Sequence, residues 1–368
     1  MAGSTYGNIF KISTWGESHG KALGVVIDGC PAGLPLCEED IQLYLNRRKP
    51  GQNSLSTPRK EDDLVEIMSG VFEGKTTGTP ISLIVRNTSQ KSADYSEIAS
   101  YYRPGHADYT FDEKYGFRDY RGGGRSSGRE TIGRVAAGAI AAKILKEMGI
   151  EICAYTESIG PVQINYENFD KANILTTPTC MPDAAASADA ELYLKNCREE
   201  LDSCGGVIAC TVTNVPAGIG EPVFDKLDAG LAKAMLSIGA VKAFEMGDGI
   251  ASAFQKGSQN NDAFKMIDGK VSKITNHSGG TLGGISDGSP LIFRAFVKPT
   301  PSIFKEQQTV NKSGEDITVQ IKGRHDPIIV PRAVVVVECM TALTILDLMM
   351  VNMSSKLDSL ISFYKDNN

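Results

Sequence analysis

The chain has 368 residues, of which 41% are hydrophobic and 22% charged, and its formal net charge is −6. This composition is typical of a globular protein, and the acidic balance argues against a general binder of nucleic acids or membrane surfaces. The eight cysteines include no Cys-x-x-Cys pair, so we expect reduced thiols rather than a zinc ribbon or a disulfide framework. No apolar signal-peptide core is visible near the N-terminus, and we expect a cytoplasmic protein.

Apolar runs and helical spacing predict helices and strands that are mixed without a regular alternation, so a parallel doubly wound sheet is not predicted. Strands are expected at residues 23–28, 80–86, 207–215 and 317–321. Helices are expected at residues 38–47, 131–149, 183–203 and 224–236.

The apolar tract 333–351 contains Glu338 and Asp347, which predicts a buried core element rather than a membrane span. No linker divides the chain, and glycine-rich loops occur throughout it. We therefore expect one domain, residues 1–368, whose loops converge on a site.

The run from Tyr115 to Thr131 concentrates basic residues among glycines. It contains three consecutive glycines, two serines and four arginines, namely Arg118, Arg121, Arg125 and Arg129. Glycines let a backbone approach a ligand, helix starts favour anions, and arginines bind phosphate through paired hydrogen bonds. We interpret the run as a site for the phosphate of a small molecule, although Asp119 and Glu130 can neutralise two arginines. The alternative is a non-catalytic anion- or RNA-binding module, against which the net charge and the missing RNA-recognition motif count.

All four histidines, His19, His106, His277 and His325, lie in expected loops. A histidine titrates near ~6.5 and can transfer a proton at working pH, whereas the plain alternative is a surface or hydrogen-bonded side chain. Neither His-x-x-x-His nor His-Glu-x-x-His occurs, so no metal site is expected. A serine hydrolase is a weaker alternative, because Ser18 lacks the Gly-x-Ser-x-Gly surroundings of a hydrolase nucleophile. A histidine-dependent phosphatase or phosphotransferase is a further alternative.

Two other segments rich in small or hydroxylated residues allow a binding role. Residues 298–302 offer a lysine and two hydroxyls, as a phosphate cradle would, and a plain loop fits them equally well. Residues 247–252 lack the third glycine of a dinucleotide-binding fingerprint, and no P-loop motif occurs.

Six motifs, in order, resemble those of the chorismate synthase family, and the resemblance extends from about residue 7 to residue 332. The motifs occupy residues 16–20, 103–108, 115–131, 279–284, 298–302 and 323–327. The resemblance implies an α+β fold, a sandwich with a helical layer between antiparallel sheets, and a homotetramer. It also implies the conversion of 5-enolpyruvylshikimate 3-phosphate to chorismate by an anti 1,4-elimination. That reaction requires reduced FMN without net redox change, and some family members use NADPH as the reductant.

The resemblance assigns roles to individual residues. His19 would protonate the departing phosphate, His106 would keep the reduced flavin in the right protonation state, and Asp326 would take part in removing the proton. Arg48, Arg103 and Arg134 would bind the substrate or NADP. The positions that would bind the flavin are Arg125, Ser126, Ser127, Gly239, Ala240, Gly283, Lys298, Pro299, Thr300, Pro301, Ser302 and Arg324.

Three positions depart from the family pattern. Ser54 stands where members often have arginine, Gly239 where many have asparagine, and Gly128 where alanine is common. The first departure removes one charge from the basic segment, and the second leaves a backbone contact where a side chain is usual.

Overall fold

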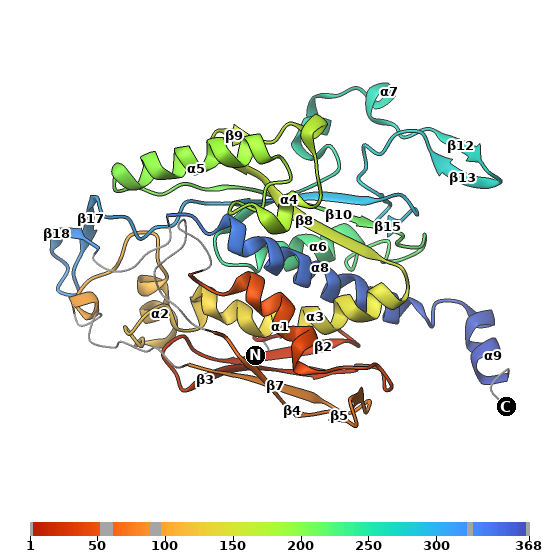
Figure 1. The fold of residues 1–368 in the computed structure, drawn as a ribbon, viewed down its shortest axis with the longest axis horizontal. Helices are drawn as coiled ribbons and strands as arrows, with labels where there is room; N and C mark the ends of the chain where they lie inside the picture. The colour runs from red at the N-terminus through yellow and green to blue at the C-terminus, as the bar shows by residue number, and fades with distance from the viewer. Residues whose placement is uncertain (1–2, 52–61, 88–96, 322–326, 366–368) are drawn as a thin grey trace.

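Two antiparallel sheets enclose a layer of helices in the computed structural model of the chain (Figure 1). The structure describes residues 3–51, 62–87, 97–321 and 327–365. The first sheet has the strand order β1 (Thr5–Tyr6), β2 (Lys11–Gly16), β3 (Ala22–Asp28), β7 (Ile81–Arg86) and β4 (Val65–Ser69). The second sheet has the order β11 (Val241–Met246), β16 (Leu291–Val297), β10 (Gly206–Thr213), β8 (Glu151–Ile159) and β9 (Val162–Gln163).

Strands form where alternate residues are apolar, because successive side chains of a strand point to opposite faces. In β3 and β7 the inward side chains are almost fully buried and lie opposite each other. The opposed pairs are Leu23 with Val85, Val25 with Leu83, and Ile27 with Ile81. The same alternation in β16 turns Leu291, Phe293, Ala295 and Val297 toward the core.

The helical layer contains α1 (Glu38–Arg48), α3 (Thr131–Glu147), α6 (Leu227–Leu236) and α8 (Val330–Asn352). Helices α3 and α8 pack closely against each other: a Cβ atom on Gly138 would lie 2.3 Å from the Cβ atom of Cys339. Helix α8 is long and apolar enough to cross a membrane by length and composition, but 78% of its apolar window is buried inside the protein. It is the buried core element predicted for residues 333–351.

Polar contacts satisfy the two acidic residues of α8. Both oxygens of Glu338 accept hydrogen bonds from Arg47, at 3.0 and 2.6 Å. Asp347 accepts backbone hydrogen bonds from Asn8, Ile9 and Phe10, at 2.7–3.0 Å. The two acids can be buried in this apolar helix because their oxygens accept hydrogen bonds from other segments of the chain.

The remaining elements surround this sandwich. The helices are α2 (Asp108–Tyr115), α4 (Asn173–Thr176), α5 (Ala184–Glu199), α7 (Gly257–Asn260) and α9 (Leu357–Lys365). The short strand pairs are β5 (Val71–Phe72) with β6 (Lys75–Thr76), β12 (Phe264–Ile267) with β13 (Lys270–Lys273), β14 (Thr281–Leu282) with β15 (Ile285–Ser286), and β17 (Glu306–Val310) with β18 (Asp316–Gln320).

The eight predicted helices and strands are present, and α3 ends at Glu147, two residues before the expected residue 149. Three other elements have ends shifted by two to four residues for identifiable reasons. Helix α5 ends at Glu199 rather than at residue 203, because Leu201 takes a left-handed backbone with φ 60°. Strand β10 ends at Thr213 rather than at residue 215, because Asn214 does the same with φ 65°. Helix α6 begins at Leu227 rather than at residue 224, because Lys226 before it has a non-helical backbone with ψ 146°. The sequence patterns predicted neither α2 nor strands β2, β8, β11 and β16.

Candidate active site

His19 lies in the turn that connects β2 to β3. Gly16 ends β2 with φ 85°, and the amide of Gly20 donates to the carbonyl of Glu17 at 3.1 Å. The imidazole packs against Gly122: a Cβ atom there would lie 2.6 Å from Cδ2 of His19. The first histidine motif and the arginine–glycine run, about a hundred residues apart in sequence, therefore meet.

Ser18, the neighbour of His19, has a buried hydroxyl. The residue is 3% exposed, and its Oγ atom has no hydrogen-bond partner among the described residues. A Cβ atom on Gly122 would lie 3.2 Å from this oxygen. A buried polar atom without a partner inside the chain is suited to a ligand.

The arginine–glycine run forms two 3₁₀ turns before α3 begins. The turns cover Gly124–Ser126 and Gly128–Glu130, and the Ser127 hydroxyl accepts from the amide of Arg129. Arg125 extends back to β2, where its guanidinium donates to the carbonyls of Gly16 and Thr14 at 3.1 Å each. The run is thereby tied to the strand that leads into the His19 turn.

Carboxylates lie beside most arginines of the site. Asp119 pairs with Arg121 at 2.8 Å, and Glu130 pairs with Arg134 at 2.7 Å and with Arg125 of the run at 3.6 Å, which confirms that these two acids pair with arginines. The other pairs are Arg48 with Asp63 at 2.6 Å, Arg129 with Asp63 at 3.1 Å, Arg103 with Asp108 at 2.7 Å, and Arg118 with Asp112 at 2.6 Å. The positive charge of the run is thus lower than its composition indicates, and ligand contacts by Arg48, Arg103 and Arg134 stay predictions.

His106 joins two of the predicted motifs. Its Nδ1 atom lies 3.1 Å from the carbonyl oxygen of Pro104, and its Nε2 atom lies 2.9 Å from Oγ of Ser302. Because a carbonyl oxygen only accepts, Nδ1 carries a proton. Lys298 donates to the carbonyl of Gly105 at 3.1 Å, and a Cβ atom on Gly105 would lie 2.7 Å from Cβ of Pro301. Segment 298–302 therefore packs directly on the His106 loop.

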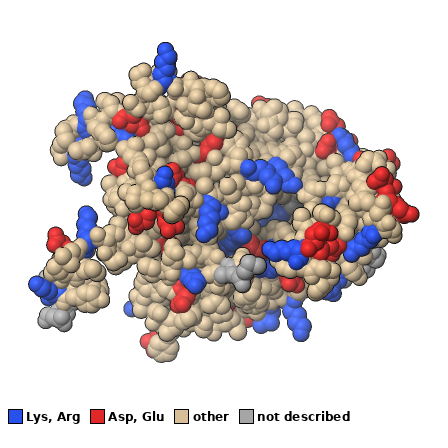
Figure 2. Space-filling view, turned by 180° about the vertical axis from the view of Figure 1, so that it is seen from behind, with Lys and Arg blue, Asp and Glu red and all other residues tan. Residues whose placement is uncertain are grey.

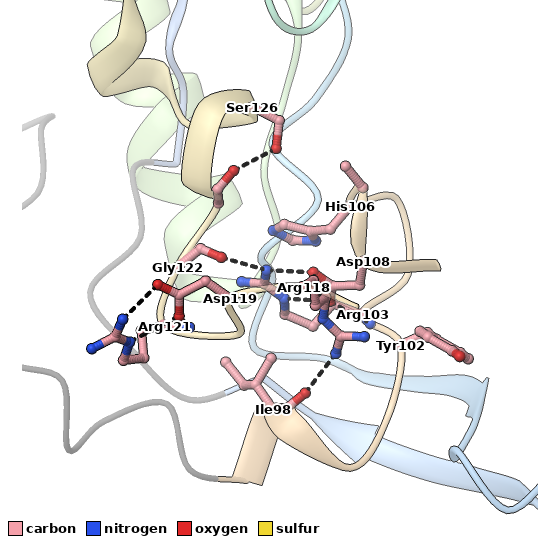
Figure 3. A network of polar contacts seen from close by, with 12 residues as sticks. Ile98, Tyr102, Arg103, His106, Asp108, Arg118, Asp119, Arg121, Gly122 and Ser126 are labelled. Atoms are coloured by element: carbon pink, nitrogen blue, oxygen red, sulfur yellow. Dashed lines mark hydrogen bonds and ion pairs between the residues drawn. The ribbon is translucent and has the colours of Figure 1, made fainter. Parts of the chain in front are cut away.

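A buried ion-pair network supports the His106 loop (Figure 3). Arg103 donates from Nε and Nη2 to the two oxygens of Asp108 at 2.7 Å each, and it reaches the carbonyl of Gly122 at 3.5 Å. Burial alone would raise the pKa of Asp108, but the hydrogen-bonded Arg103 guanidinium holds it below its usual value. Arg118, also buried, donates to Asp112 and to the carbonyls of Ile98 and Tyr101. The network joins the 103–108 loop to the arginine–glycine run.

The loop after α6 carries two predicted flavin positions. The amide of Lys298 donates to the carbonyl of Ala240 at 2.9 Å, which places this loop beside segment 298–302. Arg134 of α3 donates to Oγ of Ser237 at 2.6 Å. Nothing lies within 4 Å of a Cβ atom built on Gly239, so its backbone is open.

Two predicted flavin positions, Gly283 and Gly239, lie apart from each other. Gly283 lies in the β14–β15 turn, next to Gly284, whose carbonyl accepts from the first residue of α6. Gly239 follows the last turn of this ten-residue helix, so the two glycines lie at opposite ends of about 15 Å of helix.

Several predicted positions lie outside the described residues. They are Ser54, Arg324, His325 and Asp326. The next described residue after the last three, Pro327, accepts a hydrogen bond from the amide of Cys204 at 3.2 Å.

Sequence patterns missed three residues that organise the site. Asp63 pairs with Arg48 and Arg129, and no motif marks it. Asn87 bonds to Arg129 and to the His19 turn, and it stands alone after a predicted strand. Asp108 is the last residue of the 103–108 motif, so its position was available although its pairing with Arg103 was not.

Charge is mixed on the face shown in Figure 2, where Lys and Arg side chains gather toward the middle with acidic side chains among them. Among the described residues, no group of three or more His, Cys, Asp or Glu side chains is arranged to hold a metal ion.

The two sheets, the helical layer and the meeting of loops define a class: an α+β sandwich enzyme with its candidate site built from segments far apart in sequence. A family model described as chorismate synthase matches residues 10–350. The chain is 70% identical to the chorismate synthase of Lachnoclostridium phytofermentans over 99% of this chain and 100% of that protein. It is 68% identical to the chorismate synthase of Agathobacter rectalis over the same shares.

A solved structure described as a crystal structure of chorismate synthase superposes with a TM-score of 0.77 and 30% identity, covering 98% of both chains. The chain belongs to the chorismate synthase family. It is a carbon–oxygen lyase of aromatic amino acid biosynthesis, and the α+β sandwich expected from the six motifs is confirmed.

Proposed function

We propose that the chain converts 5-enolpyruvylshikimate 3-phosphate to chorismate by an anti 1,4-elimination, with reduced FMN required and no net redox change. The observation that carries the proposal is the convergence of the His19 turn, the His106 loop, the arginine–glycine run and segment 298–302. Relatives of 70% and 68% identity that bear the name chorismate synthase support it.

The residues at this place fit a flavin that carries a phosphate. The backbone of Gly239 is open to a ligand, and half-buried Lys298 offers a positive charge for a phosphate. The buried Ser18 hydroxyl has no hydrogen-bond partner among the described residues and is suited to a ligand. The positions proposed to hold FMN are Arg125, Ser126, Ser127, Gly239, Ala240, Gly283, residues 298–302 and Arg324. Reduced FMN would supply electron density to the allylic system as the carbon–oxygen bond breaks.

In this proposal His19 acts as the general acid for the leaving group. A departing phosphate develops negative charge on the oxygen that leaves carbon, and a proton delivered there lowers the barrier. The imidazole of His19 packs against Gly122 of the arginine–glycine run. Such a proton transfer contributes about 10²–10⁴-fold to a rate.

His106 would keep the reduced flavin in the right protonation state. Nδ1 of His106 donates its proton in a hydrogen bond to the Pro104 carbonyl. Nε2, which faces Ser302, is therefore the nitrogen that would gain or lose a proton. Asp326 would take part in removing the ring proton. Arg48, Arg103 and Arg134 would contribute to binding the substrate or NADP, a role that each would share with its carboxylate partner.

The decisive experiment is anaerobic turnover of 5-enolpyruvylshikimate 3-phosphate, with release of phosphate and chorismate measured together. Chemically reduced FMN should support turnover, and NADPH in place of the reductant tests whether the protein reduces its own flavin. His19→Ala and His106→Ala should each lower turnover tenfold or more, about the lower end for proton-transfer residues. Phosphate release without FMN would contradict the proposal and indicate a phosphatase.

We also propose an oligomeric state, a location and partners for the enzyme. Residues 1–368 would act as one catalytic domain in a homotetramer in the cytoplasm, with a small-molecule substrate and no nucleic-acid or membrane partner. Light scattering of the purified protein measures the oligomer directly, and a mass of one chain would contradict it.

A further inference from the structure

Asn87 links the first sheet to the turn that carries His19. It follows the last residue of β7, and its amide donates to the carbonyl of Lys21 at 3.1 Å, which continues the pairing of β3 with β7. Its side-chain Nδ2 donates to the carbonyl of Glu17 at 3.0 Å and to that of Gly20 at 2.9 Å. These two carbonyls flank Ser18 and His19, so one side-chain amide holds both ends of the turn.

The orientation of the Asn87 amide is determined by its partners. Its Oδ1 accepts from Nε of Arg129 at 3.1 Å and from Nη2 at 2.8 Å. Arginine only donates and a carbonyl only accepts, so oxygen must face Arg129 and nitrogen must face the turn. Nη1 of Arg129 lies 3.1 Å from Asp63, whose other oxygen lies 2.6 Å from Arg48.

The charged part of this chain of contacts is buried. The side chain of Asp63 is fully buried, and those of Arg48 and Arg129 are 2% and 7% exposed. An ion pair joins Asp63 to Arg129, and hydrogen bonds join Arg129 to Asn87, so these residues connect the segment before α3 to the His19 turn. A buried polar network in which the donors and acceptors match specifies one geometry.

We infer that Asn87 is a positioning residue for His19: it sets the direction of the imidazole by clamping the backbone on both sides of it. This inference rests on the proposed function, because it assigns Asn87 an effect on the proton that His19 delivers. The imidazole itself packs against Gly122, where a Cβ atom would lie 2.6 Å from Cδ2. A misplacement of about 1 Å at a reacting group can lower a rate about 10²-fold.

Asn87→Asp is the sharpest test, because it keeps the side-chain size and the oxygen that faces Arg129 but removes both Nδ2–H donors. With chemically reduced FMN, kcat should fall about tenfold or more while KM for the enolpyruvyl substrate changes less than about threefold. The same change in a His19→Ala background should lower kcat less than about twofold, since the residue that Asn87 positions is then absent.

Asn173→Asp provides the matched control. Asn173 is also a half-buried amide that donates to a backbone carbonyl, that of Pro182 at 3.0 Å, and it lies in α4 away from the site. Its substitution should leave kcat unchanged. Asn87→Ser, too short to reach both carbonyls, gives a second variant if Asn87→Asp does not fold, as judged by circular dichroism.

Normal kcat in a folded Asn87 variant would overturn the inference. So would an equal loss of kcat in the presence and absence of the His19 imidazole, because that result would show a general structural role. A wild-type enzyme that fails to turn over with reduced FMN would contradict the proposed function instead. The two failures are therefore distinguishable.

Discussion

The Nε2 atom of His106 lies 2.9 Å from the Oγ atom of Ser302, although 196 positions separate the two residues in the chain. The contact joins the loop before α2 to the segment after β16. Because Nδ1 is already bonded to the Pro104 carbonyl, the Ser302 hydroxyl faces the ring nitrogen that can gain or lose a proton.

Ser302→Ala should therefore alter how His106 titrates. The loss of one hydrogen bond, about 1 kcal/mol, corresponds to about a fivefold fall in turnover, smaller than the loss expected for His106→Ala. The pH at which turnover is half-maximal should also move, as a pH–rate profile with reduced FMN would show. Ser187→Ala, which removes a hydroxyl bonded to Thr179 at 2.8 Å on helix α5, is the control and should change neither. An unmoved pH profile for Ser302→Ala would refute the linkage.

Gly122→Ala should displace His19. The new methyl group would lie 2.6 Å from Cδ2 of the imidazole, and Gly122 has φ 109°, a backbone that residues with a Cβ atom rarely adopt. Turnover should fall about tenfold or more, and the overpacking should lower the free energy of unfolding by about 1–3 kcal/mol.

Gly128→Ala is the matched substitution six positions further on. A Cβ atom there meets nothing within 4 Å, and its backbone is not in the left-handed region, so turnover should be unchanged. Equal turnover in the two alanine variants would show that the contact between Gly122 and His19 has no role.

Asp63→Ala should destabilise the protein strongly. It would leave two buried guanidinium groups, those of Arg48 and Arg129, without the carboxylate that lies between them. Removing one partner from a buried ion pair lowers the free energy of unfolding by about 3–5 kcal/mol, which urea unfolding would measure.

The comparison for Asp63 is Glu66→Ala on the neighbouring strand β4. Glu66 and Arg86 form a pair of similar length, 2.8 Å, but their side chains are 48% and 62% exposed, so the loss should stay below about 1 kcal/mol. Similar losses in both variants would mean that burial does not strengthen the Asp63 pairs.

Asp108 should make stability depend on acid pH. Its pKa is lowered in the folded protein, since Arg103 outweighs the opposing effect of burial, whereas in the unfolded chain it titrates near ~3.9. A lowered folded pKa adds stability above the unfolded value, and this stability disappears as the pH falls through the folded value. The free energy of unfolding should therefore decrease below about pH 4, and less steeply for Asp108→Asn.

Urea unfolding at intervals between about pH 6 and pH 3 would measure this slope. Asp189→Asn, on the exposed face of α5, should retain the wild-type slope. If Asp108→Asn also retained it, the pairing with Arg103 would not contribute to acid sensitivity.

The sequence alone determined the local elements and the six motifs of the family. Helix α3 could be predicted because its apolar residues recur at helical spacing and Gly149 follows its end, and β7 because its apolar residues alternate. These patterns act between residues a few positions apart, and so a single sequence contains them. The motifs also placed His19, His106 and the arginine–glycine run together in one family site before any geometry was known.

Only the tertiary structure decided which charges meet. The sequence shows arginines clustered near glycines, but Arg48 and Arg129 share a carboxylate, Asp63, that no motif marks. Asn87 reaches the His19 turn only because β3 and β7 pair side by side in the first sheet. Such pairings depend on how the sheets and the helical layer pack, since electrostatic and hydrogen-bond partners are selected by distance in space and not by distance along the chain.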